Sequence, residues 1–461
     1  HTELISLFID ENKEKRRTTI HGIRVYDLEN IDRVTRELKI ERIFVADDLK
    51  DNSSGLAVLD RLSDLPVLMS TLPKINDFLA GRLDRTAIRE VGIGDLLGRR
   101  VVPPKKDLMH AAVKGRNILI TGAAGTIGSQ LCDTIIAHEP PSIILLDHSE
   151  IGLYNLQKQL EKKSGTRSEI IFLLGSIMDQ EYLESVISRF QIDKVYHAAA
   201  YKHVHLVEEN IISGVRNNVL GTLNLVKSIR RSPVEELVLI SSDKAVHPKN
   251  VMGATKRLAE MIVLNFAEKE PGKIFSLVRF GNVMRSSGSV IPLFEDQIRN
   301  GGPVTVTDGR ATRYFMTSLE ASQLVIQASA MAKGGEIFVL DMGAPIRIET
   351  LAKKMIHLHG KSFVGEHEAN DRENEIEIKY TGLRAGEKLN EKLFASEEFI
   401  KTGHPRIFVS SETDPKIFEI EKVCKSLEKA CKASDHKAIK SIVEGCINGF
   451  ELENISLDPR W

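Results

Sequence analysis

Short apolar runs alternate with amphipathic stretches through the middle of the chain, from about residue 115 to 345. The runs are typical of buried strands, and several stretches between them repeat apolar side chains at helical spacing. Strands that alternate with helices predict a parallel sheet covered on both faces, the doubly wound α/β fold, whose ligands bind beyond the carboxyl ends of the strands. The apolar runs end at Thr121, Asp147, Gly175, Ala198, Ser241 and Phe280.

The first hundred residues predict a separate, small α/β domain. Apolar runs at 23–25, 42–46 and 66–69 indicate short buried strands. This part has no glycine-rich fingerprint, so a docking or regulatory role without a ligand is the simpler interpretation. The basic, proline-containing stretch 98–106 indicates a linker.

Residues 411–461 predict a helical tail of two helices, the second of which follows a start signal at Ser434-Asp435. Three cysteines lie on the apolar faces, which favours core packing over metal binding. These faces contain Ile420, Val423, Cys424, Leu427 and Cys431, then Ile439, Ile442, Val443, Cys446 and Ile447.

Composition excludes several classes of function. The 461 residues are 42% hydrophobic and 28% charged, which is ordinary for a globular protein of two or three domains. A net charge of −1 provides no basic field for nucleic acid or an anionic membrane. The four cysteines show neither zinc spacing nor a disulfide framework, so we expect a reducing, cytoplasmic compartment. No apolar stretch approaches the roughly 20 residues that span a bilayer.

A glycine-rich turn follows the expected strand 117–121, with the spacing G-x-x-G-x-x-G. Such glycines permit a tight turn and close approach of the backbone to a pyrophosphate, and the next helix supplies free N–H groups. A tight turn without a ligand is the competing interpretation. We predict a dinucleotide site whose phosphates meet Gly122, Gly125, Thr126, Ile127 and Gly128.

The ends of the next three strands complete the predicted cofactor site. Asp147 ends the second strand, where a carboxylate can hold both ribose hydroxyls and repel a 2′-phosphate, so NAD is favoured over NADP; the nearby His148 weakens this preference. Ser176 and Ile177 follow the third strand, at the expected adenine edge. The fourth strand ends in the small residues Ala198, Ala199 and Ala200, which let a dinucleotide lie against the backbone.

Three histidines near the fourth strand, His197, His203 and His205, raise the question of a metal. No acidic pair lies at ligand spacing beside them, so we expect no metal site. Tyr201, Lys202 and His203 are expected to line the cleft between cofactor and substrate instead.

The predicted chemistry centres on the fifth strand and the helix after it. Ser242-Asp243-Lys244 follow this strand, at the sheet edge that would face a nicotinamide. Met252 and Lys256 have the spacing of the Tyr-x-x-x-Lys pair of short-chain dehydrogenases. A thioether has no ionisable proton and cannot replace the phenolate. Either the chain is catalytically inactive or the Asp243-Lys244 pair moves the proton. The competing interpretation of Asp243 and Lys244 is an exposed ion pair without a catalytic role.

The run from Ser242 to Arg257 resembles the nucleotide-sugar 4,6-dehydratases of the extended short-chain dehydrogenase superfamily. It is most similar to the long, polysaccharide-biosynthesis type of UDP-N-acetylglucosamine 4,6-dehydratase, which retains configuration at C5. That group has methionine at the tyrosine position and a Thr-Asp-Lys triplet, and Ser242 keeps the hydroxyl of the threonine. The resemblance is dense over 115–410 and weak before that. Other matching blocks lie at 197–204, 217–222, 279–283, 286–292, 307–308, 312–316 and 382–388.

The resemblance implies how the chain is divided and where it works. Residues 115–280 are expected to form the NAD-binding Rossmann domain, and 281–410 a smaller nucleotide-sugar part interleaved with it. Residues 1–100 match the extra N-terminal domain of the long members. Those members carry membrane helices ahead of it, so we expect an inner-membrane anchor before His1, with this part in the cytoplasm. The superfamily usually dimerises, which predicts a homo-oligomer.

The implied reaction removes water from UDP-N-acetylglucosamine. Hydride leaves C4 to NAD as the O4 proton is removed, water is lost across C5 and C6, and hydride returns to C6. We expect Lys244 to take the C5 proton, Asp243 to protonate the departing C6 hydroxyl and Ser242 to bond O4, if burial and charge tune the Asp243 and Lys244 pKa values toward neutrality. The O4 proton goes to Asp243 or through Ser242. Lys256 is expected to hold the nicotinamide ribose.

By the same resemblance, Asn282 and the backbone at Ser289 and Val290 reach the UDP moiety. Arginine suits phosphate because its fork bonds two oxygens, so two arginines and a glutamate are expected at the diphosphate and ribose. The predicted substrate-binding residues are Lys202, His203, Asn282, Ser289, Val290, Arg313, Arg384 and Glu387.

Two other functions compete with the dehydratase. A UDP-hexose 4-epimerase shares fold and cofactor but needs the tyrosine, so Met252 argues against it. A non-catalytic NAD-binding regulator would have no need of Asp243, Lys244 and Lys256, all of which are present.

Overall fold

The computed structural model describes residues 4–10, 12–15, 18–46, 53–72, 88–96, 102–162, 167–364, 374–384, 386–393, 399–412, 419–447 and 450. The chain divides into two compact units, each made of several segments. The first unit contains 1–100, 290–310 and 347–382, and the second contains 101–289, 311–346 and 383–461. Two segments of the expected nucleotide-sugar part thus group with the N-terminal residues. Part of the expected linker, 98–101, lies outside the described residues.

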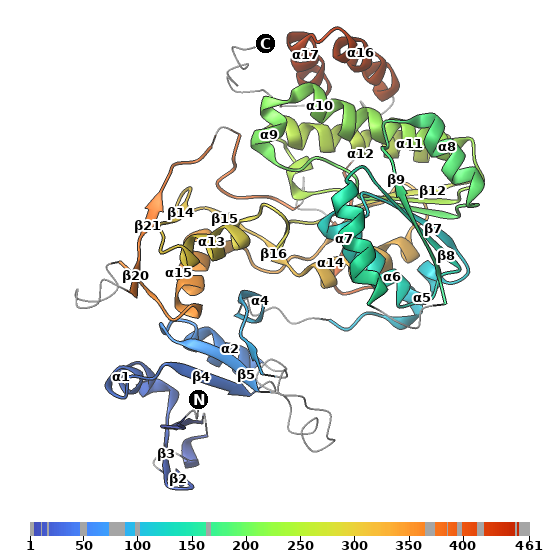
Figure 1. Ribbon diagram of the computed structural model, residues 1–461. Coiled ribbons are helices and arrows are strands. Elements are labelled where there is room, and N and C mark those ends of the chain that lie inside the picture. The colour runs from blue at the N-terminus through green and yellow to red at the C-terminus, as the bar shows by residue number, and fades with distance from the viewer. Residues whose placement is uncertain are drawn as a thin grey trace. The chain divides into compact units, whose positions relative to one another are not determined.

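A nine-stranded sheet forms the centre of the second unit (Figure 1). The strand order is β22-β23-β17-β12-β11-β10-β7-β8-β9, and the strands from β17 to β9 run parallel. This order confirms the doubly wound fold. The strands are β7 (Asn117–Thr121), β8 (Ser142–Asp147), β9 (Glu169–Leu174), β10 (Lys194–His197), β11 (Glu236–Ile240), β12 (Ile274–Arg279), β17 (Ile337–Leu340), β22 (Phe399–Lys401) and β23 (Ile407–Ser410).

Helices cover both faces of this sheet (Figure 1). The central strands β8, β10 and β11 are buried along their whole length, which explains their unbroken apolar sequences. One face carries α5 (Lys106–Val113), α6 (Thr126–Ile136), α7 (Glu150–Glu161) and α14 (Ser318–Met331). The other carries α8 (Gln180–Arg189), α11 (Gly221–Arg230) and α12 (Val251–Lys269).

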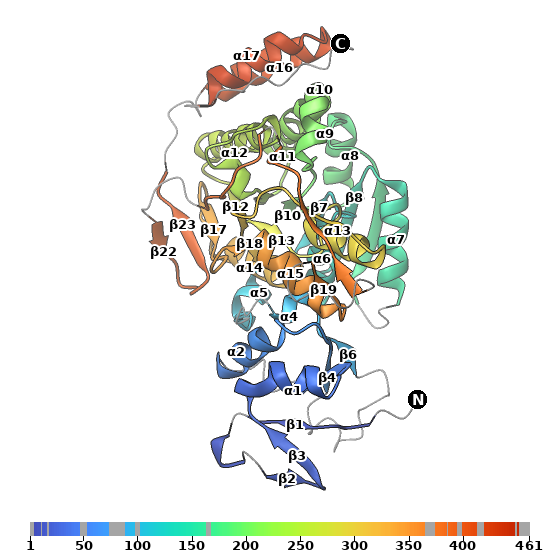
Figure 2. The ribbon, with the colours of Figure 1, turned by 90° about the vertical axis from the view of Figure 1, so that its left-hand side faces the viewer.

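The helical tail consists of α16 (Ile420–Lys432) and α17 (His436–Cys446), with Asp435 as the N-cap of the second helix (Figure 2). Both helices pack on α10 (Ile211–Val215), and α16 also contacts α12. The tail cysteines are buried in this contact, which confirms their expected role in core packing. None of the described helices is both long and apolar enough to cross a bilayer.

The first unit joins the N-terminal residues to the two later segments. Lys354 of α15 (Ile348–Leu358) donates to Asp60 at 2.5 Å and to Ser63 at 2.7 Å. The strand expected at 66–69 is β5, which begins two residues later because Pro66 has no N–H for a sheet ladder. The other elements are β1 (Phe8–Ile9), β2 (Thr19–Ile20), β3 (Ile23–Tyr26), α1 (Ile31–Glu37), β4 (Arg42–Ala46), α2 (Ser53–Leu62), β5 (Leu68–Leu72), β6 (Arg89–Glu90), α4 (Ile93–Leu96), α13 (Val290–Arg299), β14 (Val304–Val306) and β21 (Ile378–Tyr380).

A buried ion cluster fixes α12 to the carboxyl ends of β11 and β12. The Glu260 carboxylate on α12 accepts hydrogen bonds from Arg279 at 2.6 and 2.7 Å, from Arg257 at 3.1 Å and from the Ser241 hydroxyl at 2.5 Å. Arg279 also pairs with Glu412, beyond β23. Burial alone would raise the pKa of Glu260, but the two arginines lower it to about 2. The carboxylate therefore stays ionised inside the protein.

Replacing Arg279 by Met should lower the free energy of unfolding by about 3–5 kcal/mol, because part of the charge on Glu260 loses its partner without access to water. Urea unfolding measures the loss. Arg230→Met is the matched control: its ion pair with Glu270 is half-exposed and should contribute less than about 1 kcal/mol. Equal losses in the two variants would contradict the argument from burial.

Candidate active site

The glycine-rich turn between β7 and α6 leaves no room for a side chain at Gly122 or at Gly128. Gly122 has a φ of +71°, and a Cβ there would lie 2.5 Å from the Ala199 nitrogen. A Cβ on Gly128 would lie 2.0 Å from the Gly122 carbonyl oxygen. The first turn of α6 therefore packs directly on the sheet, and its N-terminal residues line an open cavity. This is the arrangement in which helix N–H groups bind phosphates.

The cavity has a volume of about 710 Å³ and follows the carboxyl ends of β7, β10 and β11. It brings together most of the predicted residues, in both the cofactor and the catalytic sets. From the predicted sets the lining contains Gly122, Gly125, Thr126, Ile127, Gly128, Ala198, Ala200, Lys202, His203, Ser242, Lys244, Met252, Lys256, Asn282 and Ser289.

Several predicted cofactor residues stand behind this lining. Asp147 is buried, and its carboxylate accepts N–H bonds from Ala124 at 3.0 Å and Ser149 at 2.9 Å. Ser176 accepts from the Met178 N–H, and Ile177 packs in the core. Asp147 thus stabilises the glycine-rich turn. A ribose that binds its carboxylate would share it with these two backbone N–H groups.

A short 3₁₀ turn, Asp243–Ala245, presents the catalytic candidates. Ser242 caps this turn by accepting the Lys244 N–H, and its hydroxyl donates to Asp243 Oδ1 at 2.8 Å. The Lys244 ammonium lies 3.2 Å from Asp243 Oδ1 and 3.2 Å from Asn282 Oδ1. Asp243 is fully buried, and its Oδ2 makes no hydrogen bond among the described residues. Lys244 therefore lines the cavity, and Asp243 lies buried behind it.

The pKa of Lys244 is not shifted toward neutrality, as the sequence predicted, but away from it. Desolvation favours the neutral amine, but the carboxylates of Asp243 and Glu391 outweigh it and raise the pKa of Lys244. The side chain is therefore an ammonium in the resting site. Lys202 behaves in the opposite way, because partial burial and the charge of Lys244 lower its pKa.

Met252 occupies the first turn of α12 and is 2% exposed. Glu208 accepts the Val251 N–H at 2.5 Å and caps this helix start, and desolvation raises the pKa of Glu208 to about 7. One turn further, Lys256 donates to the Ile240 carbonyl at 2.6 Å. Burial lowers the pKa of Lys256 to about 8, although Glu260 opposes the shift. No phenol occupies this position, so the proton must be handled elsewhere.

His197 belongs to the core of the sheet. Its ring bonds Thr121 at 2.7 Å and Thr222 at 3.0 Å, and burial with the nearby Lys256 lowers its pKa to about 3. The ring is neutral and both nitrogens are in use. No metal-binding group of His, Cys, Asp and Glu side chains occurs in the part of the chain that the structure describes.

Asn218 is a site residue for which the sequence reasoning proposed no role. Its amide exchanges hydrogen bonds with the Tyr201 backbone at 2.8 and 3.0 Å and donates to Thr255 at 3.0 Å. It therefore fixes the loop after β10, which carries Lys202, to the first turns of α12. A π-helical segment, Arg216–Leu220, holds Asn218, and a local change of helix type leaves no clear pattern in a single sequence.

The predicted substrate residues fall into two groups. Asn282 and Ser289 line the cavity, and Ser289 Oγ is a buried hydroxyl without a hydrogen-bond partner among the described residues. Val290 begins α13, in the other unit. The Arg313 side chain bonds Glu387 at 3.0 Å, and Arg384, whose side chain is exposed, donates its backbone N–H to Glu387 at 3.3 Å.

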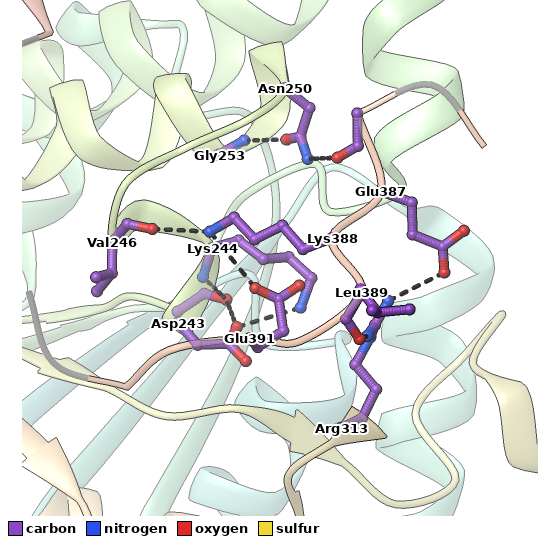
Figure 3. Close-up of polar contacts among 12 residues, drawn as sticks. Asp243, Lys244, Val246, Asn250, Gly253, Arg313, Glu387, Lys388, Leu389 and Glu391 are labelled. Atoms are coloured by element: carbon purple, nitrogen blue, oxygen red, sulfur yellow. Dashed lines mark hydrogen bonds and ion pairs between the residues drawn. The ribbon is translucent and has the colours of Figure 1, made fainter. Parts of the chain in front are cut away.

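Two further residues beside Lys244 were missed by the sequence reasoning, Lys388 and Glu391 (Figure 3). Lys388 donates to the Val246 carbonyl at 2.8 Å and lies 3.5 Å from Glu391 Oε2. Both belong to a segment more than a hundred residues after β11. A matching block reached as far as Lys388, but no role was expected for it.

A model of the family described as polysaccharide biosynthesis protein matches residues 118–412, well over half of the chain. The protein belongs to this family. It is 41% identical over 403 residues to the capsular polysaccharide biosynthesis protein CapD of Staphylococcus aureus, covering 87% of this chain and 65% of CapD. It is 40% identical over 409 residues to the probable polysaccharide biosynthesis protein EpsC of Bacillus subtilis, covering 88% of this chain and 67% of EpsC. The chain thus spans about two thirds of the length of these relatives.

Among solved structures, Pen from Bacillus thuringiensis is similar with a TM-score of 0.58 and 35% identity, over 65% of this chain and 88% of Pen. A UDP-glucose 4-epimerase from Rickettsia typhi is a more distant relative, 31% identical over 291 residues, which are 62% of this chain and 80% of the epimerase. The match to the family supports the resemblance that the motifs suggested.

Gly128→Ala should abolish dinucleotide binding, because its Cβ would overlap the backbone that must approach the phosphates. Titration calorimetry measures binding, and circular dichroism reports folding. Gly272→Ala, where a Cβ meets nothing within 4 Å, is the matched control. A folded Gly128→Ala protein with unchanged affinity would refute the assignment of the turn.

Dinucleotide affinity should weaken by about tenfold between pH 7 and pH 9.5, because Lys256 loses its proton as the pH rises through about 8 and a charged donor is lost. Fluorescence titration measures the dissociation constant at each pH. In the Lys256→Met variant we expect weak binding that no longer varies with pH. An equally steep pH dependence in that variant would assign the titration to another group.

Proposed function

We propose that this protein is an NAD-dependent UDP-N-acetylglucosamine 4,6-dehydratase, a hydro-lyase that forms UDP-2-acetamido-2,6-dideoxy-4-keto-hexose. The observation that carries the proposal is the Asp243–Lys244 ion pair: Lys244 lines the cavity that also reaches the glycine-rich turn, and Asp243 lies buried behind it. Elimination of water needs an acid and a base beside the sugar, and this pair supplies both. Met252 removes the phenol that simple dehydrogenation would use.

NAD fits the residues that are present. The turn at Gly122 and Gly128 admits a backbone-bound pyrophosphate, and the buried charge of Asp147 would repel a 2′-phosphate. NAD supplies a reversible hydride acceptor for C4 and donor for C6. Lys256, held by the Ile240 carbonyl, is placed to bond the nicotinamide ribose.

In the proposed reaction Ser242 holds O4, Asp243 takes the O4 proton and later protonates the departing C6 hydroxyl, and Lys244 moves the C5 proton. The hydroxyl of Ser242 already donates to Asp243 Oδ1, so a short path from O4 to the carboxylate exists. Because Lys244 is an ammonium at rest, it must lose a proton before it can act as the base at C5. Retention at C5 follows if the same amine returns the proton to the same face.

The substrate contacts are proposals that rest on position. Asn282 and Ser289 line the cavity, with the backbone at Val290 next in the chain, and Lys202 and His203 line it from the loop after β10. The Arg313 guanidinium bonds Glu387, and a diphosphate could replace that carboxylate as its partner. Arg384 gives Glu387 only its backbone N–H, which leaves its exposed side chain for a phosphate. We infer that the product enters bacterial surface polysaccharide or glycoprotein sugar synthesis, which agrees with the family. A homo-oligomer and an inner-membrane anchor ahead of His1 remain predictions.

A UDP-hexose 4-epimerase is the second candidate, favoured by the 31% identity to the Rickettsia typhi protein of that name. Epimerisation returns hydride to C4 and needs no acid at C6. The burial of Met252 and the Asp243–Lys244 pair argue for elimination instead. A non-catalytic NAD-binding regulator has no use for this pair.

Incubation of the chain with UDP-N-acetylglucosamine and NAD should give a 4-keto-6-deoxy sugar nucleotide without net NADH, as followed by NMR. Asp243→Asn and Lys244→Ala should each lower turnover by at least about 100-fold, because each removes one partner of the acid–base pair. The exposed changes Asp296→Asn and Lys158→Ala are controls that should leave turnover unchanged. A C4 epimer as the product, or normal activity in either site variant, would refute the proposal.

A further inference from the structure

The residues 286–289 form a tight turn at the rim of the cavity, which we call the strap. The Ser289 N–H donates to the Ser286 carbonyl at 2.9 Å, and Gly288 has a φ of +67°. A glycine with positive φ at the third position is typical of a type II turn. All four residues line the cavity, and Ser287 and Gly288 are also exposed to solvent.

Two contacts join the strap to two walls of the cavity. The Ser287 N–H donates to Thr126 Oγ1 at 3.3 Å, and Thr126 is the first residue of α6. Gly288 lies directly against the His203 ring, because a Cβ on Gly288 would lie 2.4 Å from the ring carbon Cε1. His203 is the N-cap of α9 (Val204–Glu209). The strap therefore connects the start of α6 to the start of α9, within the second compact unit.

The first of these contacts lies where the phosphates of a dinucleotide are expected. The first turn of α6 offers its free N–H groups to a pyrophosphate, and Thr126 belongs to that turn. A threonine hydroxyl can accept the Ser287 N–H and still donate its own proton to a phosphate oxygen. The pyrophosphate is the middle of a dinucleotide. The strap would therefore lie beside the bound dinucleotide near its centre.

We propose that the strap retains the dinucleotide in the cavity, and that the Ser287–Thr126 hydrogen bond opens each time a dinucleotide enters or leaves. This bond is long and lies at the exposed rim, so it can open without disturbing the core. The inference rests on the dinucleotide site of the proposed function and adds control over release from that site.

The proposed reaction gives such a strap a purpose. Hydride leaves C4 and returns to C6 within one turnover, so the cofactor ends as it began and has no need to exchange. If the reduced cofactor left between the two transfers, the oxidised sugar could not be completed. A strap that slows release protects the reaction at that stage, as closing loops do in other enzymes.

The test is Ser287→Pro in the full chain, with NADH as the fluorescent probe and excess NAD to displace it in stopped flow. Proline suits the second position of a type II turn and has no N–H, so it should keep the turn and remove the bond to Thr126. Ser287→Ala is the matched control, because it loses the same hydroxyl and keeps the N–H. Relative to this control, NADH should be released about three- to fivefold faster, the effect of one lost hydrogen bond.

Binding should accelerate by the same factor, because the strap must open for entry as well as for release. The Kd for NADH should therefore change by less than about twofold. A residue that merely touched the phosphates would behave differently, since its loss would speed release, leave binding unchanged and weaken the affinity.

Thr126→Val removes the acceptor of the same hydrogen bond and is the second variant. The double variant with Ser287→Pro should release NADH no faster than Thr126→Val alone, because both changes remove one shared bond. Thr126→Ser keeps a hydroxyl and should restore slow release.

Gly288→Ala tests the second contact, because its Cβ would overlap the His203 ring and displace the strap. We expect release of NADH to be at least about fivefold faster, as in the loss of a closing contact. Gly115→Ala is the matched control, since Gly115 has a φ of +69° and a Cβ there meets nothing within 4 Å. Circular dichroism reports the folding of every variant.

The opposite results overturn the inference. These are equal release rates in Ser287→Pro and Ser287→Ala, a weaker Kd with an unchanged binding rate, or additive effects in the double variant. A wild-type chain that does not bind NADH overturns the dinucleotide site and the proposed function with it. A wild-type chain that forms no 4-keto-6-deoxy product, but shows the expected NADH kinetics, overturns the proposed function and leaves the strap in place.

Discussion

The ionised carboxylate of Glu260 is the constraint on which the site depends. It lies inside the protein, one helical turn after Lys256, and its partners come from β12, from the end of β11 and from α12 itself. An anion in that environment is stable only while all of its partners stay in place. The cluster therefore fixes the helix that holds Met252 and Lys256 against the strand whose end becomes Ser242, Asp243 and Lys244. Any relative shift of these two elements would break several charged hydrogen bonds together.

The protonation states of the two cavity lysines, Lys244 and Lys256, depend on burial and on nearby carboxylates. Burial pushes Lys256 toward the neutral form and Glu260 offsets it only in part, whereas two carboxylates hold Lys244 as an ammonium despite its burial. The pKa values of two lysines in one cavity are thus shifted in opposite directions, according to the balance between burial and neighbouring charges. Such a site can use one lysine, Lys256, for cofactor binding and the other, Lys244, for proton transfer, without a tyrosine.

The sequence predicted the fold and the cofactor end of the site because those signals are local. The glycine spacing after β7 and the apolar strands can be recognised from short stretches of consecutive residues. The bounds of β4 and β7 are those that the sequence predicted. Asp147 shows the limit of such reasoning: its position was predicted, but not that backbone N–H groups already use its carboxylate. Lys388 and Glu391 carry no local signal of their role, because their significance lies in contacts across as many as 142 positions. The joining of segments 290–310 and 347–382 to the N-terminal unit was missed for the same reason.

The late position of the Gly386–Glu391 segment has a consequence for the order in which the protein is made. The residues that line the cavity all lie between Gly122 and Ser289, so they leave the ribosome well before Lys388 and Glu391. Contacts of such long sequence separation are the last to close during folding. A nascent chain thus has the lining residues of the cavity, and then α14, which packs on α6, before it has Lys388 and Glu391. A dinucleotide that binds the folded cavity would stabilise it by mass action. The cofactor would then serve as a folding ligand before it serves as a reactant.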